Sequence, residues 1–352
     1  MELYIYSPDI ELQGIIDGYS SLRWRRRFFE PGEFELHCPA SDGNIALLQE
    51  GNIIHRLDRQ EAGIIEGISI ATTDTGGDEI MVTGRMGSSM LSQRIIKPTI
   101  NFSGTVEDAM RKVVSDNAIT ARPIPHLVLG DTIGLATTCA FQATYKTALT
   151  VCEKLAKAAL LGFKMRLDVL NKQWVFEVYN GVDRSVTQTE RPFVLFSKEY
   201  GNINGSTYTR DCTGYANYAY VAGQGEGDGR VIVEIDRTNG EPLRELWVDA
   251  RDLQQAEGQT DADYQAQLRQ RGFEKLAEVN RSESFSAAAV DTGNFAYLTD
   301  WDLGDIVSFE CWGIRLDQRI TEVEEVDEGG VVTVTPTCGS PLPETLNLGD
   351  DY

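Results

Sequence analysis

The sequence predicts a mainly β protein with α+β insertions, in which two barrel-like β blocks flank a small α+β domain. Three observations lead to this prediction. Short segments with alternating apolar and polar residues, separated by turn residues, fill the first hundred positions. Similar segments resume after residue 193, and between the two blocks the apolar residues recur with a helical period. We therefore expect domains at 1–98, 99–192 and 193–352, the last with a helical insertion near 260–280.

The first block is predicted to contain strands separated by turns and one short helix. Its regular strand spacing suits an antiparallel barrel or sandwich. The helix is expected at 44–50, where Gly51 can end it. The strands are predicted at 2–6, 12–17, 22–29, 33–38, 52–57, 63–71 and 79–83.

The strand predicted at 22–29, LRWRRRFF, carries an unusual row of arginines. Successive side chains of a strand point to opposite faces, so Arg23, Arg25 and Arg27 share one face, roughly 7 Å apart. Arg26 lies with the apolar residues on the other face. One interpretation of the row is a solvated face with intrachain ion pairs. The other is a subunit or partner contact, where arginine is favoured for planar bidentate pairing with carboxylates.

The charge balance excludes a general nucleic-acid-binding surface. The chain has 54 Asp plus Glu against 32 Lys plus Arg, a formal net charge of -22, and phosphates would be repelled. Its 41% hydrophobic content is that of a soluble globular protein. The first residues, MELYIYSPDIELQG, lack the basic region of a secretory signal, and no segment has about 18 uninterrupted apolar residues. We expect synthesis and retention in the cytoplasm unless the cell lyses.

In the middle and last parts of the chain, helices are predicted where the spacing of apolar residues changes from the period of a strand to that of a helix. Thr105 opens a capping sequence before an apolar helical face, and a second helix at 147–161 has Gly162 placed to end it. A hairpin of two alternating strands, 163–168 and 174–179, follows. In the last block, the helix at 260–280 interrupts further predicted strands, among them 283–289, 305–310, 314–324 and 331–336.

Cysteine and histidine spacing gives no metal, cofactor or disulfide prediction. The six cysteines and three histidines are dispersed, without a C-x-x-C pair. His37 and Cys38 are adjacent in a predicted strand and so point to opposite faces, which prevents them from closing on one metal without a bulge. We assign no metal ligand and no cofactor.

The glycine-rich run at 223–229, GQGEGDG, is predicted to be a mobile hairpin loop between segments 218–222 and 230–235. It lacks the Gly-Lys-Ser/Thr ending of a phosphate-binding loop and the helix that should follow. Glu226 and Asp228 would repel phosphate, and they lack the dense acidic spacing of a recognised calcium loop.

No catalytic constellation is predicted, so we do not expect an enzyme. Asp300, Asp302 and Asp305 form close acidic pairs like those of glycosidases, but such pairs arise by chance in a chain this acidic. The sequence also contains no G-x-S-x-G and no H-E-x-x-H motif.

The segments, taken in order, resemble a family of siphovirus and prophage tail proteins from Gram-positive hosts, the ReqiPepy-type baseplate-hub or tail-tip family. No single segment is a strong motif, but the ordered set covers nearly the whole chain. The matching stretches are WRRRFFEPGEFELHCPA, LLQEGNIIHR, GIIEGI, VTGR, SGTVEDAMRKVV, IPHLVLG, YANYAYVAGQGEGDGR, RELWVDARDL, YQAQLRQRGFEKLAE, LGDIVSFE, RITEVEEV and VTPTCG.

The resemblance implies a structural hub similar to the trimeric baseplate hub of contractile-tail phages. Two barrel-like tube domains per subunit would give a trimer six similar domains around a channel that continues a hexameric tail tube. The implied partners are the distal tail protein, the tail tube, the tape-measure protein and fibre or spike proteins, and DNA would pass during genome ejection without specific binding. The implied location is the virion tail tip or baseplate, after synthesis in the bacterial host cytoplasm. Arg23, Arg25 and Arg27 are then candidates for the subunit or partner interface.

Two alternatives remain, a tail-associated cell-wall hydrolase and a carbohydrate-binding module. The second is motivated by five tryptophans, although most lie in predicted strands with apolar neighbours, where core packing is the expectation. They are Trp24, Trp174, Trp247, Trp301 and Trp312. The chain stops soon after its last β block, at PLPETLNLGDDY, so we expect enzymatic or receptor-binding work to belong to other tail proteins.

Overall fold

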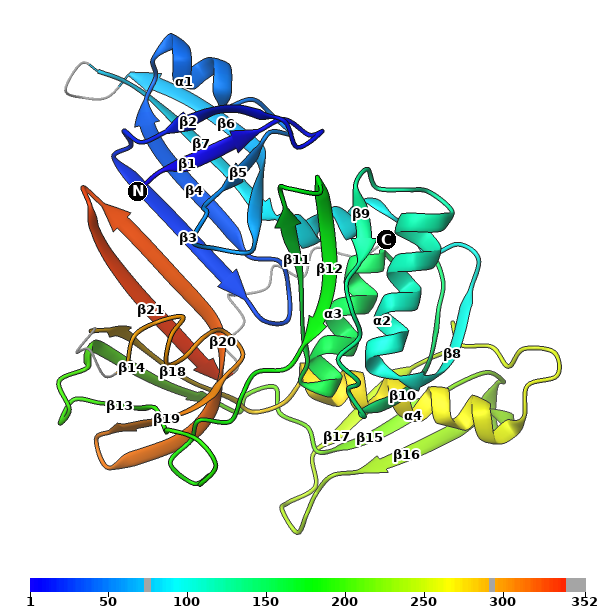
Figure 1. Cartoon of the computed structure of the whole chain (residues 1–352). Coiled ribbons are helices and arrows are strands. Elements are labelled where there is room, and N and C mark those ends of the chain that lie inside the picture. Colours follow the sequence, from blue (N-terminus) through cyan, green and yellow to red (C-terminus); the bar gives the residue numbers. More distant parts are fainter. Residues whose placement is uncertain (73–76, 291–294, 340–352) are drawn as a thin grey trace. The chain divides into compact units, whose positions relative to one another are not determined.

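The computed structural model describes residues 1–72, 77–290 and 295–339, and it confirms a mainly β protein with 44% strand and 18% helix (Figure 1). Among these residues the sheets are open, and none closes into a barrel. The chain forms two compact units. The first comprises Met1–Asn180, Ala216–Glu278 and Glu324–Thr333, and the second comprises Gly181–Tyr215, Val279–Val323 and Val334–Tyr352. The division into domains at 1–98, 99–192 and 193–352 stays a prediction.

The first unit begins with the β block that the sequence predicts. Its strands are hydrogen-bonded in the order β20-β3-β4-β7-β6-β5-β1-β2, with only the end of β20 belonging to this unit. The strands are β1 (Leu3–Tyr6), β2 (Leu12–Ile16), β3 (Ser21–Arg27), β4 (Glu33–Pro39), β5 (Ile53–His55), β6 (Ala62–Thr72), β7 (Asp78–Met86) and β20 (Ile314–Glu328).

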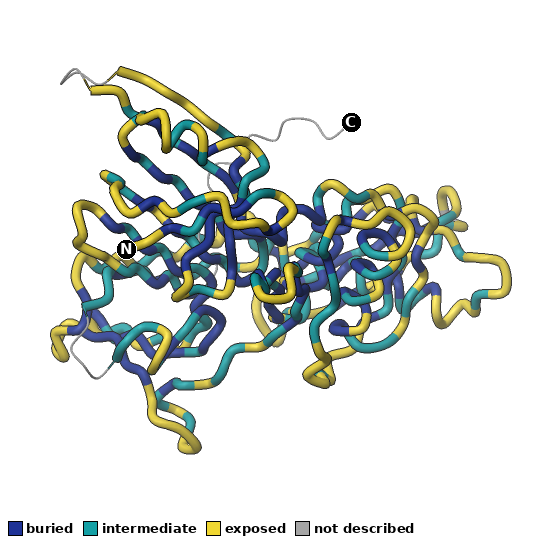
Figure 2. The backbone as a smooth tube through the Cα atoms, turned by 45° about the horizontal axis from the view of Figure 1, so that its top comes forward, coloured by how far each residue is buried: buried dark blue, intermediate teal, exposed yellow. Residues whose placement is uncertain are grey.

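Alternation along these strands builds one of the two main cores of the first unit. In β4, Phe34, Leu36 and Cys38 are buried while the residues between them are partly exposed. Trp24 of β3 faces Phe34 across the ladder, with ring centroids 5.9 Å apart. Figure 2 shows long buried stretches inside the trace, and exposed residues in the outer loops and at the far end of some strands, such as β6.

The predicted helices of the first unit are all present, with small shifts of their ends. α1 (Asp42–Leu47) begins two residues before its predicted start and ends three residues before its predicted end, so Leu48 and not Gly51 takes the capping position. α2 (Val106–Val114) starts as predicted, because the Thr105 hydroxyl accepts a hydrogen bond from Asp108 N at 3.1 Å, and a π-helical turn (Ser115–Thr120) extends it. α4 (Asp261–Glu278) is capped in the same way by Thr260.

The second predicted helix ends differently from the prediction. α3 (Ala148–Ala159) is followed by Leu160 in the left-handed region at φ 57°, so Leu160 takes the terminating position that we assigned to Gly162. Gly162 instead opens β11 (Gly162–Asp168), where a Cβ atom would lie 2.5 Å from the ring of Phe28. The glycine is therefore explained by close packing rather than by helix termination.

Three smaller sheets complete the first unit. β11 pairs with β12 (Gln173–Tyr179) as the predicted hairpin, and β9 (Leu127–Leu129) adds to β12 in parallel. β8 (Ile100–Thr105) pairs with β10 (Thr138–Ala143). β15 (Tyr218–Ala222) lies between β16 (Ile232–Asp236) and β17 (Glu245–Asp249), and α4 packs on this third sheet. α2, α3 and the first two of these small sheets surround the other main core.

The second unit is a β structure around an aromatic core. Its strands are hydrogen-bonded in the order β14-β18-β21-β20, and β19 joins β20 to β13. The ring of Phe196 stacks on Phe309 at 4.9 Å and meets Trp301 edge-on at 5.4 Å. The remaining strands are β13 (Leu195–Ser197), β14 (Ile203–Asp211), β18 (Ser282–Ala289), β19 (Ile306–Cys311) and β21 (Val331–Gly339). Among the described residues, none of the helices in either unit has the length and apolarity needed to cross a membrane.

Candidate interaction site

The arginine row lies on β3 with the alternation that the sequence predicts. Leu22, Trp24 and Arg26 are buried, whereas the side chains of Arg25 and Arg27 are about one-fifth exposed and that of Arg23 is half exposed. The row therefore forms the outer face of β3, and Arg23 is its most accessible member.

Carboxylates on both neighbouring strands contact this row. On β4, Glu33 accepts hydrogen bonds from Arg25 Nη1 at 2.6 Å and from Arg27 Nη2 at 2.9 Å. On β20, Glu324 lies 2.7 Å from Arg25 Nη2 and 3.2 Å from Arg23 Nε. The structure thus contains the intrachain ion pairs of the first interpretation. Partly exposed pairs of this kind contribute about 0.2–1 kcal/mol each, and the interface role of the row stays a prediction.

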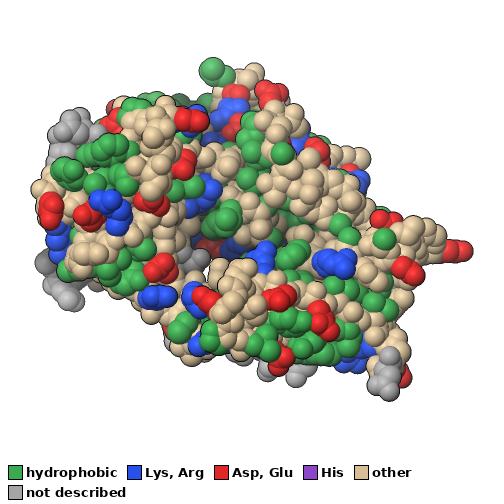
Figure 3. Space-filling model, turned by 90° about the horizontal axis from the view of Figure 1, so that it is seen from below, with side chains coloured by type: hydrophobic (Ala, Val, Ile, Leu, Met, Phe, Trp, Pro, Cys, Tyr) green, Lys and Arg blue, Asp and Glu red, His purple; other side chains and the backbone are tan. Residues whose placement is uncertain are grey.

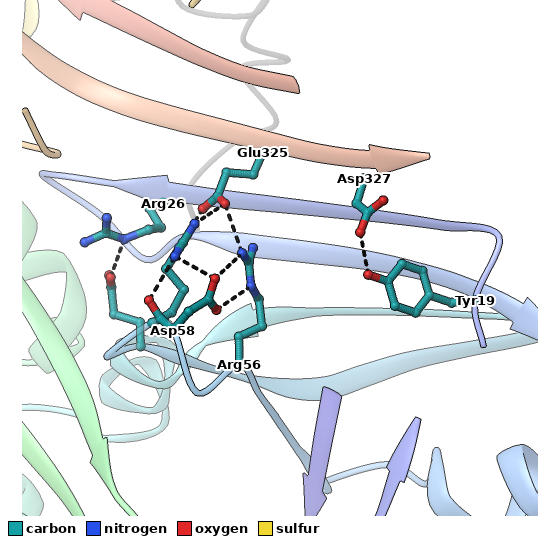
Figure 4. A network of polar contacts seen from close by, with 8 residues as sticks. Tyr19, Arg26, Arg56, Asp58, Glu325 and Asp327 are labelled. Atoms are coloured by element: carbon teal, nitrogen blue, oxygen red, sulfur yellow. Dashed lines mark hydrogen bonds and ion pairs between the residues drawn. The ribbon is translucent and has the colours of Figure 1, made fainter. Parts of the chain in front are cut away.

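A buried ion-pair network lies on the opposite side of β3 and β20 (Figure 4). Glu325 of β20 accepts hydrogen bonds from Arg56 Nη2 at 3.1 Å and from Arg59 Nε at 2.8 Å. The side chains of Arg56 and Glu325 are each 3% exposed. Asp58 also pairs with Arg56, so two guanidinium groups are balanced by two carboxylates.

Two further contacts surround this buried network. Arg26 donates through Nε to Glu61 at 2.5 Å, and both side chains are buried. The Tyr19 hydroxyl donates to Asp327 at 2.6 Å; burial and this hydrogen bond raise the pKa of Tyr19 well above its ordinary value. Buried charges are stable when they are paired and hydrogen-bonded. The contacts from Glu325 and Asp327 therefore hold the end of β20 against the first β block.

The pKa of Asp58 gives a testable pH dependence. Burial opposes ionisation of this carboxyl, but the hydrogen bonds and charge of Arg56 outweigh it and lower the pKa. A lowered pKa in the folded state contributes stability above the unfolded value near 4, and that contribution is lost as pH falls through the folded pKa. We expect Asp58→Asn to be less stable than the parent at neutral pH, with a difference that shrinks as the pH falls below the unfolded pKa near 4. Urea unfolding of both proteins across this range measures it, and a pH-independent difference would contradict it.

Sequence reasoning did not find the buried network. One sequence signal for it was present: Glu325 and Asp327 alternate with the apolar Val323 and so share its face of the strand. In the structure all three side chains are buried. Charged residues at apolar strand positions indicate buried partners. The sequence does not identify these partners, because Arg59 lies 266 positions before Glu325.

The other candidate positions serve local structure. His37 and Cys38 point to opposite faces of β4, as predicted, and the His37 ring contacts Glu35 and Glu79 at 3.0 and 3.2 Å. Burial disfavours the charged His37 ring, but these two carboxylates outweigh it and raise its pKa. Within the described residues, no group of three or more His, Cys, Asp or Glu side chains is arranged to hold a metal.

The glycine-rich loop and the acidic pairs also have structural roles. The run 223–229 joins β15 and β16, which pair as the predicted hairpin. Asp305 accepts hydrogen bonds from Val182 N at 2.8 Å, Arg184 Nε at 3.0 Å and Asp302 N at 3.1 Å. Asp300 accepts one from Ala296 N at 2.8 Å. These carboxylates therefore fix turns of the second unit.

The tryptophans divide into two groups. Trp24, Trp174 and Trp301 are buried, as predicted for core residues. The core prediction is wrong for Trp247 and Trp312, which are 57% and 58% exposed. Trp312 lies in the tight turn between β19 and β20, and Trp247 lies on the uncovered face of β17.

The family model described as Siphovirus ReqiPepy6 Gp37-like protein matches residues 2–340 of the chain. The chain belongs to this siphovirus tail protein family. The resemblance that the ordered sequence segments indicated is therefore confirmed. The family is one of tail proteins rather than of enzymes. No curated protein matches the chain by sequence.

Solved prophage and tail proteins share the fold of this family member. The 43 kDa tail protein of prophage MuSo2 from Shewanella oneidensis has 12% identity and a TM-score of 0.61, covering 97% of this chain and 99% of that one. The tail protein from Neisseria meningitidis MC58 has 14% identity, a TM-score of 0.58 and 96% coverage of both chains. Prophage tail protein gp18 from Listeria monocytogenes EGD-e has 12% identity and a TM-score of 0.58, covering 96% and 94%.

Membership of a tail protein family makes the arginine row testable in assembly. Replacing the arginines with acidic residues would add carboxylates that repel Glu33 and Glu324. Glutamine is therefore the better substitute for Arg23, Arg25 and Arg27. We expect the triple glutamine variant to stay folded and to lose at most about 4 kcal/mol of unfolding free energy, because the four partly exposed pairs described above contribute about 1 kcal/mol or less each. If the row is an interface, tail assembly in a phage carrying the variant should also be weakened.

The matched control for the row is Arg85→Gln, which removes an exposed pair with Glu66 in the same β block. Counts of complete tails by electron microscopy compare the variants. Normal tail numbers with the triple variant would leave the row as a solvated face with intrachain ion pairs.

Proposed function

We propose that this chain is a structural hub or tail-tip subunit that closes or extends the tail tube and connects it to distal tail and fibre or spike proteins. The observation that carries the proposal is the family match over residues 2–340. The fold shared with prophage tail proteins over nearly their full lengths supports it.

The proposed subunit has two barrel-like tube domains, at 1–98 and 193–352, flanking the α+β domain at 99–192. Three copies then supply six tube domains around a channel. The open sheet of the first β block supports this arrangement, because among the described residues its last strand, β2, pairs on one side only, with β1, and its other edge can take a strand from a neighbouring subunit. Its partners are the tail tube and distal tail protein on one side, and tape-measure and fibre or spike proteins on the other.

The acidic composition suits a channel for DNA. Three copies carry three times -22, or -66 formal charges. A channel with the same bias repels phosphates and keeps DNA from adhering during genome ejection. Mapping side chains onto an assembled ring tests this point, and a channel lined mainly by Lys and Arg would contradict it.

The proposed location is the virion tail tip or baseplate, after synthesis in the bacterial host cytoplasm. Labelling intact virions with gold-conjugated antibody against the full chain tests the location. The proposal predicts gold at the tail end distant from the head. Label along the whole tail, or its absence from virions that contain all other tail proteins, would contradict it.

A further inference from the structure

The outer face of the sheet β16-β15-β17 combines aromatic and acidic side chains. Alternation places six positions on the inner face, on the side of α4: Ala219, Val221, Val233, Ile235, Leu246 and Val248. The other positions form the outer face. We call this set the aromatic-acidic face: Tyr218, Tyr220, Ile232, Glu234, Asp236, Glu245, Trp247 and Asp249.

The centre of the aromatic-acidic face is apolar and open. Trp247 is 57% exposed and Ile232 is 47% exposed, whereas the rings of Tyr218 and Tyr220 are half-buried with centroids 5.2 Å apart. Trp247 pairs with Tyr220 in the strand ladder, so its ring adds a third aromatic group to the two tyrosine rings. Figure 3 shows hydrophobic and acidic side chains next to one another on the surface seen from below. Clustered Tyr and Trp side chains are typical of binding surfaces.

Hydrogen bonds fix the tyrosine rings in place. The Tyr220 hydroxyl donates to Glu245 at 3.1 Å, and the Tyr218 hydroxyl donates to Glu234. The hydrogen bond to Glu234 raises the pKa of Tyr218 to about 12, so this tyrosine stays neutral. Rings held in this way lose little further entropy when a partner binds.

The charge of the face selects a cation. Its four carboxylates surround the rings, and Arg230 and Arg251 are the cations that the described contacts place on its Asp249. The Arg230 guanidinium lies 5.7 Å from the centroid of Trp247 and also pairs with Asp249. Arg230 therefore shows how this face binds a guanidinium, through an aromatic ring and a carboxylate together.

We propose that the aromatic-acidic face binds a basic segment of a partner protein that presents arginine side chains. Glu234 and Glu245, next to the two tyrosine rings, offer the same combination of ring and carboxylate that Trp247 and Asp249 offer to Arg230. The four carboxylates disfavour an anionic glycan. This proposal does not depend on the proposed hub function. Peptide binding is measured on the isolated chain, so it can fail or succeed whether or not the chain forms a ring.

Binding of labelled peptides to the full-length chain tests the proposal. The probes are a peptide of alternating arginine and serine and a matched peptide of glutamate and serine, measured by fluorescence anisotropy. We expect the arginine peptide to bind and Trp247→Ala to weaken it about tenfold, because the face loses its most exposed ring, which lies next to Tyr220, while the net charge is unchanged. Trp312→Ala removes an equally exposed tryptophan and should leave the affinity unchanged.

A second pair of variants separates local charge from total charge. Glu234→Gln with Glu245→Gln should weaken binding at least about tenfold. Glu50→Gln with Glu199→Gln removes the same number of charges at exposed positions elsewhere and should have a much smaller effect. Equal effects of the two pairs, or of the two tryptophan variants, would overturn the proposal. Binding of an N-acetylglucosamine oligomer that Trp247→Ala abolishes, without binding of the arginine peptide, would overturn it in favour of a glycan site.

Discussion

Replacing Glu325 with glutamine should lower the free energy of unfolding by about 3–5 kcal/mol. The substitution keeps the size of the side chain but removes one of the two carboxylates that balance Arg56 and Arg59, and it leaves Asp58 as their shared partner. Arg56 is buried to the same extent as Glu325, so water cannot replace the lost carboxylate. A buried guanidinium without its counter-charge bears most of the desolvation cost that the pair had offset.

The neighbouring residue supplies the matched control. Glu324 lies on the opposite face of β20, where it is about one-quarter exposed and contacts Arg23 and Arg25. We expect Glu324→Gln to cost about 1 kcal/mol or less. Urea denaturation followed by circular dichroism compares the two variants with the parent. Equal losses would show that the buried network does not fix the end of β20 as described.

Replacing Trp24 with alanine should cost about 3–5 kcal/mol of unfolding free energy. Trp24 is fully buried in the first β block, packs against Phe34 and lies beneath the Arg56 guanidinium, 5.7 Å from its ring centroid. Its removal opens a cavity beside the buried network. Core truncations lose both the transfer free energy of the side chain and the contacts around the cavity.

Trp247→Ala is the control for this core variant, because it removes the same side chain from an exposed strand position of the same unit. We expect it to change the unfolding free energy by less than about 1 kcal/mol. Thermal and urea unfolding of both variants make the comparison. A loss above about 3 kcal/mol with Trp247→Ala would mean that the aromatic-acidic face is part of the core and not a binding surface.

Much of the local structure could be predicted from the sequence. Alternation in LRWRRRFF placed Arg23, Arg25 and Arg27 on one face of β3, and the capping sequence at Thr105 placed the start of α2. These features depend on neighbours within four positions, which a single sequence shows directly. The helix end at Leu160 was missed because packing against Phe28, and not helix termination, requires Gly162.

The partners across the chain could not be predicted. Period two shows that Trp247 shares a face with Glu245 and Asp249, but it does not show which face α4 covers. The core prediction for Trp247 was therefore wrong. Likewise, Glu325 and Arg56 lie 269 positions apart, and only the folded chain brings them together. The arginine row gained its ion-pair partner Glu324 for the same reason.

Imaging of intact tails by electron cryomicroscopy, with averaging at the tail tip, tests the hub proposal most directly. The account predicts that three copies of this chain form a closed threefold ring at the end of the tube, with two domains per copy lining the channel. A virion that lacks the chain, or a tip in which its copies lie outside the channel without forming a ring, would contradict it.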